Sequence, residues 1–151
     1  MKKFLWTVVF ALWAFPLRAE VYVIDGDSLK IDEASIRLAG IDAPEYYQTC
    51  KDKNNKPYDC GISAKNALAE MVGGRLVRCV KISKDIYNRE LCECFADGVS
   101  LNLKMIETGW AVAYRSDNKA YAAAEKEAKK KKLGIWQGKF MRPELYRILN
   151  K

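Results

Sequence analysis

The stretch Val21-Tyr22-Val23-Ile24-Asp25-Gly26-Asp27-Ser28-Leu29-Lys30-Ile31 predicts two antiparallel strands joined by a tight turn. β-Branched and aromatic residues favour strands on both sides, and Asp25-Gly26 is a typical hairpin turn. A second turn, Asp32-Glu33, precedes residues 35–40, where apolar residues alternate as in a further strand. The folded part of the chain is therefore expected to begin with three consecutive strands.

The remaining elements follow from apolar spacing and from glycines that end helices. A helix is predicted over residues 63–72, and it should end at Gly73-Gly74. Residues 44–58 are polar and show no period, which predicts a surface loop. Two strands and two helices should follow, over residues 76–83, 90–96, 101–107 and 120–133. Five short strands with a helix between the third and the fourth predict an α+β fold, a five-stranded OB-fold β-barrel with three helices.

The first 19 residues have the features of a cleavable export signal. Lys2 and Lys3 precede an apolar run over residues 4–15, and Pro16 and Ala19 fit a signal-peptidase site. The run is too short to span a membrane, which takes roughly 20 residues. A first core element and an uncleaved anchor are the alternatives. We expect a signal peptide at residues 1–19 and a single domain at residues 20–151.

Charge and composition limit the possible chemistry more than they define it. The chain carries a formal charge of +7, which falls to +4 without the three basic residues of the signal. This surplus is compatible with a polyanionic partner but does not require one. The lysine run at residues 129–132 is interpreted as a solvated helix end. Because the chain has no histidine, imidazole-based catalysis and histidine metal sites are excluded.

Five cysteines lie after the signal: Cys50, Cys60, Cys79, Cys92 and Cys94. In an oxidising compartment this number predicts two disulfides and one remaining thiol. The chain has no histidine and no Cys-x-x-Cys pair, so a zinc site is not expected. The cysteines and the signal therefore agree on a periplasmic or secreted protein.

Two acidic segments, Asp25-Gly26-Asp27-Ser28 and Gly40-Ile41-Asp42-Ala43-Pro44-Glu45, are the strongest candidates for chemistry. Each by itself is more often a turn than a site. Neighbouring antiparallel strands can bring Asp27 and Asp42 to one edge, where carboxylates and a backbone carbonyl bind hard cations such as Ca²⁺. Arg37 should point the same way, and its guanidinium suits bidentate phosphate binding.

Three segments belong together: Val23-Ile24-Asp25-Gly26-Asp27-Ser28-Leu29, Ile36-Arg37-Leu38-Ala39-Gly40-Ile41-Asp42-Ala43-Pro44-Glu45 and Asp85-Ile86-Tyr87-Asn88-Arg89. They resemble the signatures of the staphylococcal nuclease (thermonuclease) family, and the cysteine positions resemble those of an exported proteobacterial branch of it. Later segments agree and keep the family order: Leu101-Asn102, Glu107-Thr108-Gly109-Trp110-Ala111 and Leu133-Gly134-Ile135-Trp136. The resemblance extends over residues 21–136. One departure is Asn88, where the family commonly has glycine; asparagine tolerates the positive φ of such a turn.

The resemblance implies a role for each matching residue in the hydrolysis of DNA or RNA. Asp27, Asp42 and the backbone carbonyl of Ala43 would bind one Ca²⁺. Arg37 and Arg89 would neutralise charge on the scissile phosphate. The expected enzyme is a calcium-dependent nuclease, a monomer with no stable membrane span after cleavage of the signal. A non-catalytic exported OB-fold module that binds nucleic acid is the alternative.

Three further expectations rest on the same resemblance. Glu45 would orient or deprotonate the attacking water. Tyr87 and Tyr114 would contact the nucleotide, although both also suit ordinary half-buried barrel tyrosines. The implied disulfides are Cys50–Cys60 and Cys79–Cys94, with Cys92 free, and Cys92 is a rival partner for Cys79 because it lies on the same face as Cys94.

Overall fold

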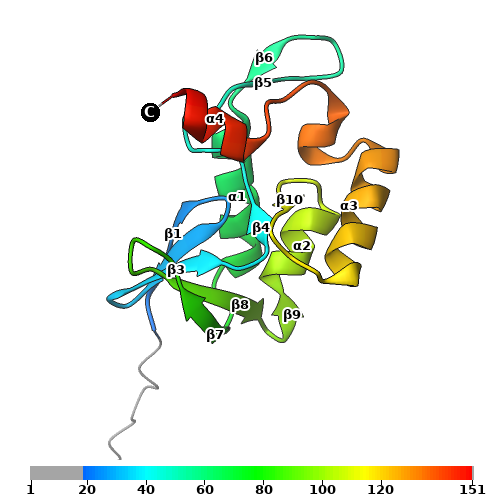
Figure 1. The fold of residues 1–151 in the computed structure, drawn as a ribbon. Coiled ribbons are helices and arrows are strands. Elements are labelled where there is room, and N and C mark those ends of the chain that lie inside the picture. The colour runs from blue at the N-terminus through cyan, green and yellow to red at the C-terminus, as the bar shows by residue number, and fades with distance from the viewer. Residues whose placement is uncertain (1–18, 151) are drawn as a thin grey trace, which may run out of the picture.

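A curled β-sheet forms the body of the molecule in a computed structural model that describes residues 19–150 (Figure 1). The predicted signal peptide falls outside the described residues, except for Ala19. The sheet order is β1-β2-β3-β8-β7, and the short strand β9 also pairs with β8. Its strands are β1 (Val21–Asp25), β2 (Ser28–Ile31), β3 (Ala34–Leu38), β7 (Val77–Lys84), β8 (Glu90–Ala96) and β9 (Val99–Ser100).

Strand pairing within this sheet is antiparallel except between β3 and β8. The parallel register sets Arg37 opposite Leu91, so the segment just before β8 enters the sheet beside β3. The side chain of Asn102 strengthens this junction, because its amide donates to the backbone carbonyls of Ala39 and Cys92 at 2.9 and 3.0 Å. The end of β3 is thereby held firmly in place.

Two small two-stranded sheets complete the β-structure. β4 (Ile41–Asp42) pairs with β10 (Val112–Ala113), and β5 (Cys50–Lys51) pairs with β6 (Pro57–Tyr58). The expectation of an irregular loop over residues 44–58 therefore missed one short hairpin. Strands of two residues are too short to show a hydrophobic period.

The described residues form four α-helices, so the expected number of three is wrong. They are α1 (Cys60–Val72), α2 (Leu101–Glu107), α3 (Lys119–Lys131) and α4 (Pro143–Leu149), with a 3₁₀ turn at Gly134–Gln137 after α3. α4 was missed because its seven residues give little periodic signal. Its sequence does carry one start signal, since Pro143 occupies the first turn and Glu144 follows it.

Two clusters of buried apolar residues lie on either side of the β4–β10 pair. The main core packs α1 and α2 against the sheet and includes Leu29, Ile36, Leu68, Met105 and Ile106. The second cluster joins the β5–β6 hairpin to the region after α3, through Cys50, Cys60, Val112, Ile135, Trp136 and Phe140. This second cluster supports the C-terminal segment, and Figure 1 shows that α4 lies across the end of the barrel above β4.

The structure contains the Cys50–Cys60 and Cys79–Cys94 disulfides, and Cys92 is a buried free thiol. Cys79 and Cys94 are direct partners in the β7–β8 register, whereas Cys92 faces Lys81. The register therefore explains why Cys94 and not Cys92 pairs with Cys79. Within residues 19–150, none of the helices is both long enough and apolar enough to cross a membrane.

Candidate active site

The two acidic segments meet where the turn between β1 and β2 approaches β4. The backbone N–H of Ala43 donates to Asp27 Oδ2 at 2.9 Å and fixes this approach. Gly26 makes it possible, because a Cβ there would lie 2.7 Å from Ala43 Cβ and 2.8 Å from Ala64 Cβ. The turn can therefore sit against β4 and α1 only with glycine at this position.

Arg37 joins the two aspartates from the side of β3. Its Nη1 donates to Asp27 Oδ1 at 2.7 Å and its Nη2 to Asp42 Oδ1 at 2.8 Å. Both carboxylates are almost fully buried, with side-chain exposures of 3% and 1%. One guanidinium thus bridges a buried carboxylate of the β1–β2 turn and one of β4, so the structure brings Asp27, Arg37 and Asp42 together, as the sequence analysis expected.

Asp27, Arg37 and Asp42 form a charged cluster, in which burial leaves the negative charge of the two carboxylates incompletely compensated. Burial raises the pKa of Asp27 to about 6, even though Arg37 and the hydrogen bonds from Ala43 and Ser28 act in the opposite direction. Burial likewise raises the pKa of Asp42. Burial alone would lower the pKa of Arg37, but Asp27 and Asp42 outweigh it and raise that pKa. A site of this kind favours an additional cation.

The raised pKa of Asp27 predicts how stability depends on pH. The ordinary pKa is 3.8 and the folded value is about 6, so the folded state binds the proton more tightly. Protonation of Asp27 therefore stabilises the folded protein fully below about pH 4, and this stabilisation is lost as the pH rises to about 6. We expect the Asp27→Asn variant to gain about 3 kcal/mol of unfolding free energy relative to the wild type over this window.

Urea unfolding of both proteins in a chelator, at half-unit steps from pH 4 to 7, measures this difference. A difference that does not change with pH would mean that Asp27 titrates normally in the folded protein.

Arg147 of α4 approaches the same cluster from the opposite side. Its Nη1 donates to Asp42 Oδ1 at 2.8 Å and to Glu45 Oε1 at 2.6 Å, and its Nη2 donates to Asp42 Oδ2 at 3.2 Å. The sequence analysis did not find this residue. It lies 105 positions from Asp42 on a helix without periodic signal, and neither the spacing nor the quoted motifs point to it.

The hydrogen bond from Arg147 links Glu45 to the same charged cluster. The side chain of Glu45 is 32% exposed, so it faces solvent at the edge of the buried carboxylates. Its backbone N–H donates to Gln48 Oε1 at 3.2 Å, and Gln48 is buried and also donates to the carbonyl of Met141 at 2.7 Å. Gln48 therefore holds the Glu45 backbone and the start of the C-terminal segment together.

The structure does not bring Arg89 into the cluster. Its Nε donates to Asp85 Oδ2 at 2.7 Å within the turn between β7 and β8. Asn88 in that turn has a φ of 63°, the left-handed conformation that the sequence analysis anticipated. Tyr87 is exposed at the tip, with the Arg89 guanidinium 5.7 Å from its ring centroid. Arg89 and Tyr87 thus form a separate, solvent-facing group.

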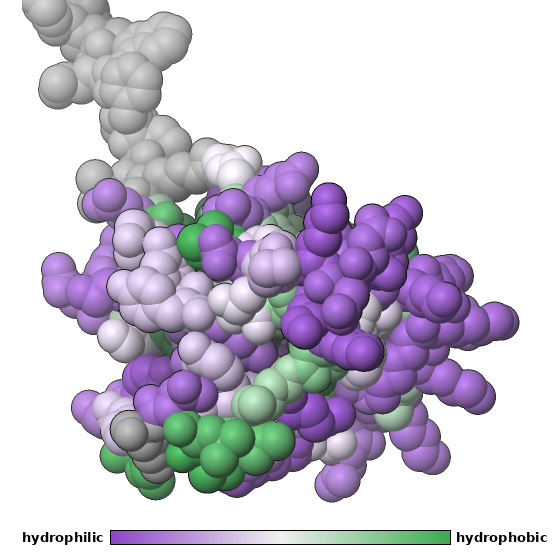
Figure 2. Space-filling model, turned by 90° about the horizontal axis from the view of Figure 1, so that it is seen from above, coloured by the Kyte–Doolittle hydropathy of each residue, from purple (hydrophilic) through white to green (hydrophobic). Residues whose placement is uncertain are grey.

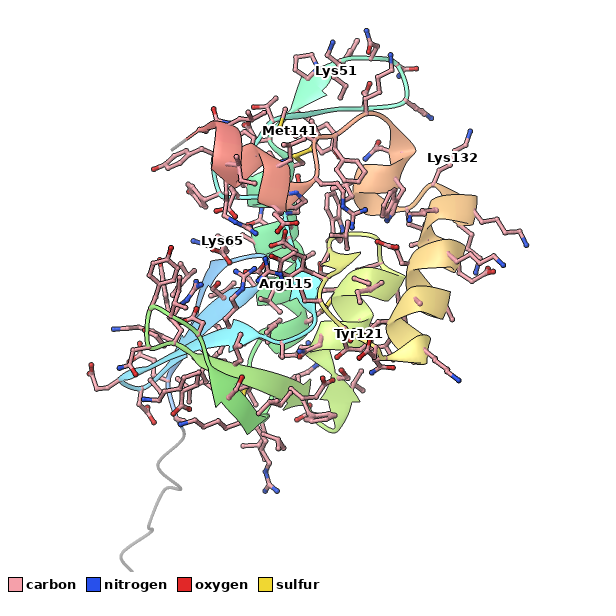
Figure 3. The ribbon with its side chains drawn as sticks, in the orientation of Figure 1. Lys51, Lys65, Arg115, Tyr121, Lys132 and Met141 are labelled. Atoms are coloured by element: carbon pink, nitrogen blue, oxygen red, sulfur yellow. A yellow bond between two sulfur atoms is a disulfide. The ribbon has the colours of Figure 1, made fainter. Side chains whose placement is uncertain are left out.

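Tyr114 lies on the other rim of the site, just after β10. Its hydroxyl donates to Glu144 of α4 at 2.9 Å, and burial, together with this contact, raises the pKa of Tyr114. The neighbouring Arg115 also reaches Glu144, at 3.3 Å, and stacks over the Tyr114 ring. Figure 3 shows Arg115 below α4, near the end of the barrel.

The donor set fits a hard cation better than a transition metal. The described residues contain no group of three or more histidine, cysteine or acidic side chains arranged to hold a metal. Two carboxylates from Asp27 and Asp42 are present, and calcium completes such sets with backbone carbonyls and water. The N–H of Ala43 donates to Asp27, so the residue whose carbonyl is the third expected ligand lies next to this carboxylate.

The protein is thus an OB-type barrel that carries two buried carboxylates bridged by an arginine, a combination suited to phosphate chemistry. The comparison with protein families gives the same class. Residues 35–138 match the family described as "Staphylococcal nuclease homologue". The chain belongs to the staphylococcal nuclease family.

Relatives in three bacteria show how the chain compares along its length. It is 39% identical over 127 residues to "Succinoglycan biosynthesis protein ExoI" of Rhizobium meliloti (82% of this chain, 66% of that protein). It is 32% identical over 123 residues to an "Uncharacterized endonuclease" of Haemophilus influenzae (77% and 64%). A protein of the same description in Escherichia coli O157:H7 is 29% identical over 149 residues, 90% of each chain. The chain spans slightly less than two thirds of the first two relatives.

Proposed function

We propose that this protein is a calcium-dependent nuclease that hydrolyses phosphodiester bonds in DNA and RNA. The observation that carries the proposal is the buried pair Asp27 and Asp42 bridged by Arg37. Carboxylates that face a polyanion hinder simple binding, because they repel it. They are useful where a cation and an arginine together stabilise charge on a phosphate that reacts.

Asp27, Asp42 and the carbonyl of Ala43 are the residues that would hold one Ca²⁺. When bound, this ion supplies Lewis-acid polarisation of the phosphate and a template for in-line attack by water. The raised pKa of Asp27 supports the assignment, because a buried carboxylate short of positive charge gains from a cation. The family membership supports the activity, since two of the relatives carry the name endonuclease.

Arg37 and Glu45 have separate roles in the proposed reaction. Arg37 donates to the non-bridging oxygens of the scissile phosphate and stabilises the charge that builds there. Glu45, at the solvent edge of the cluster, orients the attacking water and accepts its proton. Arg89 is the second phosphate clamp of this proposal, and it reaches substrate by exchanging Asp85 for phosphate. Tyr87 and Tyr114 contact the nucleotide on either side.

A broad substrate range follows from contacts directed at phosphate rather than at base edges. Both DNA and RNA have the required phosphodiester. The exposed Tyr87 offers a ring on which any base can stack. The proposed location is the periplasm or the outside of the cell, because disulfides such as Cys50–Cys60 persist in oxidising compartments.

Incubation of the protein with heat-denatured DNA and, separately, with RNA tests the proposal against the alternative of a binding module. We expect both polymers to be cut to short fragments only when Ca²⁺ is present, and gel electrophoresis measures this conversion. Shifted but intact nucleic acid at every calcium concentration would show a binding module and contradict the proposed activity.

A further inference from the structure

α4 is anchored over the site by contacts that do not involve Arg147. Glu144 accepts the hydroxyl hydrogen bond of Tyr114, and the hydroxyl of Tyr146 donates to the carbonyl of Tyr47 at 3.3 Å. Just before the helix, the carbonyl of Met141 accepts from the buried Gln48. Figure 3 shows Met141 beside α4 above the barrel. The helix therefore forms a wall of the site, and contacts other than those of Arg147 also hold it there.

The guanidinium groups of Arg37 and Arg147 converge on one oxygen atom. Each places a nitrogen 2.8 Å from Asp42 Oδ1, one from β3 and the other from α4. The two nitrogens are therefore separated by at most twice that distance, a spacing that the oxygens of one phosphate group can bridge. Arg147 is 31% exposed and Arg37 14%, so Arg147 is the more accessible of the two.

Among the ion-paired groups of the site, Arg147 also adds positive charge that favours an anionic substrate. Ion pairs link Asp27, Asp42 and Glu45 to Arg37 and Arg147, which gives a net charge of −1. One divalent cation changes this to +1, the complement of a single phosphodiester. Without Arg147 the same cluster with its cation would be neutral. The arginine thus supplies the surplus positive charge that attracts substrate.

We infer that Arg147 is a phosphate-binding residue of the active site, supplied by the C-terminal helix. In the absence of substrate, Asp42 and Glu45 hold its guanidinium next to Arg37. When a nucleic acid phosphate enters, Arg147 donates to its oxygens from the side opposite Arg37. This inference rests on the proposed function, because it makes nucleic acid the ligand of the same site. It adds a contact that the motifs of the first 136 residues do not contain.

Fluorescence anisotropy of a short single-stranded DNA with phosphorothioate linkages that slow cleavage, in Ca²⁺ and over a series of NaCl concentrations, tests the inference. Arg147→Gln should bind about tenfold more weakly than the wild type, since a charge-assisted bond is lost. The slope of log affinity against log salt should become shallower by about 0.7, the value for one phosphate contact on a single strand. Arg142→Gln, which removes an exposed arginine at the start of the same helix, is the matched control and should behave as the wild type.

Arg147→Lys provides a second variant that keeps the charge and loses the planar fork. It should bind with intermediate affinity and an unchanged salt slope. Unchanged or tighter binding by Arg147→Gln, faster cleavage by that variant, or no measurable binding by the wild type would each overturn the inference. Faster cleavage by Arg147→Gln would show that Arg147 inhibits the enzyme by occupying the carboxylates of the site.

Parallel cleavage assays with Ca²⁺ separate this inference from the proposed function. A wild type that binds DNA through Arg147 but never cleaves it would contradict only the nuclease proposal. A wild type that cleaves, together with an Arg147→Gln variant of unchanged affinity and KM, would contradict only the role of Arg147.

Discussion

The Arg37→Gln variant is expected to cleave single-stranded DNA about 10²- to 10³-fold more slowly than the wild type, measured as kcat/KM. Arg37 is the group that contacts both buried aspartates, at 2.7 and 2.8 Å, and the proposal places the phosphate next to it. Glutamine is too short and too weak a donor to replace two charged hydrogen bonds. The loss should appear mainly in kcat, because the charge that Arg37 neutralises develops in the transition state.

Loss of Arg37 also leaves two buried carboxylates with less compensation, which lowers the stability of the fold. Thermal unfolding must therefore show that the variant is folded at the assay temperature. Arg37→Lys is the conservative comparison, since lysine keeps the charge but cannot bridge Asp27 and Asp42 with one planar group. Full activity of the folded Arg37→Gln protein would remove Arg37 from the mechanism.

The Glu45→Gln variant is expected to lose about 10²- to 10⁴-fold in kcat, with its fold and substrate affinity retained. Glutamine has nearly the same shape and can still accept the hydrogen bond from Arg147. It cannot accept a proton from water, which is the function proposed for Glu45. Because the side chain is partly exposed, the substitution places no unpaired charge in the core.

Single-turnover cleavage with saturating protein isolates the chemical step in this variant. Glu107→Gln, an exposed glutamate of α2 that pairs with Lys104, is a matched control and should cleave at the wild-type rate. A Glu45→Gln protein with near-normal single-turnover rates would rule out the proposed role as base.

Local sequence patterns predicted the elements that contain enough residues to show a period. The strands around Asp25-Gly26, the β8 strand and α2 lie where the alternation and the caps indicated, and Ser100 caps α2 by accepting from the N–H of Leu103. The expected helix over residues 63–72 begins earlier, at Cys60, with Asp59 in the N-cap position. Gly61 in its first turn is a poor helix former and obscured this start. These elements follow from interactions between near neighbours.

The candidate site could be predicted only in part, for a physical reason. Asp27 directly precedes β2, whose first residue Ser28 is paired with Arg37 of β3, so the approach of Asp27 and Arg37 follows from the hairpin order. Asp42 follows only four residues after β3, on β4, which keeps it near Arg37. The position of α4 depends instead on tertiary contacts such as those of Gln48 and Tyr114. No local pattern indicates that a residue near the C-terminus returns to the site. The spacing of sequence motifs therefore could not identify Arg147 as a residue of the site.

The turn that contains Asp85 and Arg89 was, by contrast, indicated by its local sequence. The motif correctly indicated a turn, and the structure shows that Asp85 also accepts from the backbone N–H groups of Tyr87 and Arg89 at 2.9 Å. Burial would raise the pKa of Asp85, but the side-chain bond from Arg89 and these two backbone bonds outweigh it and lower that pKa. The role of Arg89 on substrate stays a prediction.

The face of the molecule that includes α4 combines hydrophilic and apolar side chains. Hydrophilic side chains cover most of the face seen from above in Figure 2, with an apolar area among them. α4 contributes exposed apolar side chains at Leu145, Ile148 and Leu149.

The most direct test of the account is the cleavage of heat-denatured DNA by the wild type and by Asp42→Asn, each with Ca²⁺ and with a calcium chelator. Asp42 contacts both Arg37 and Arg147 and is one of the two proposed carboxylate ligands. The account predicts rapid cleavage only by the wild type with Ca²⁺, and loss of nearly all activity in the other three samples. Cleavage that continues in the chelator, or in folded Asp42→Asn with Ca²⁺, would contradict it.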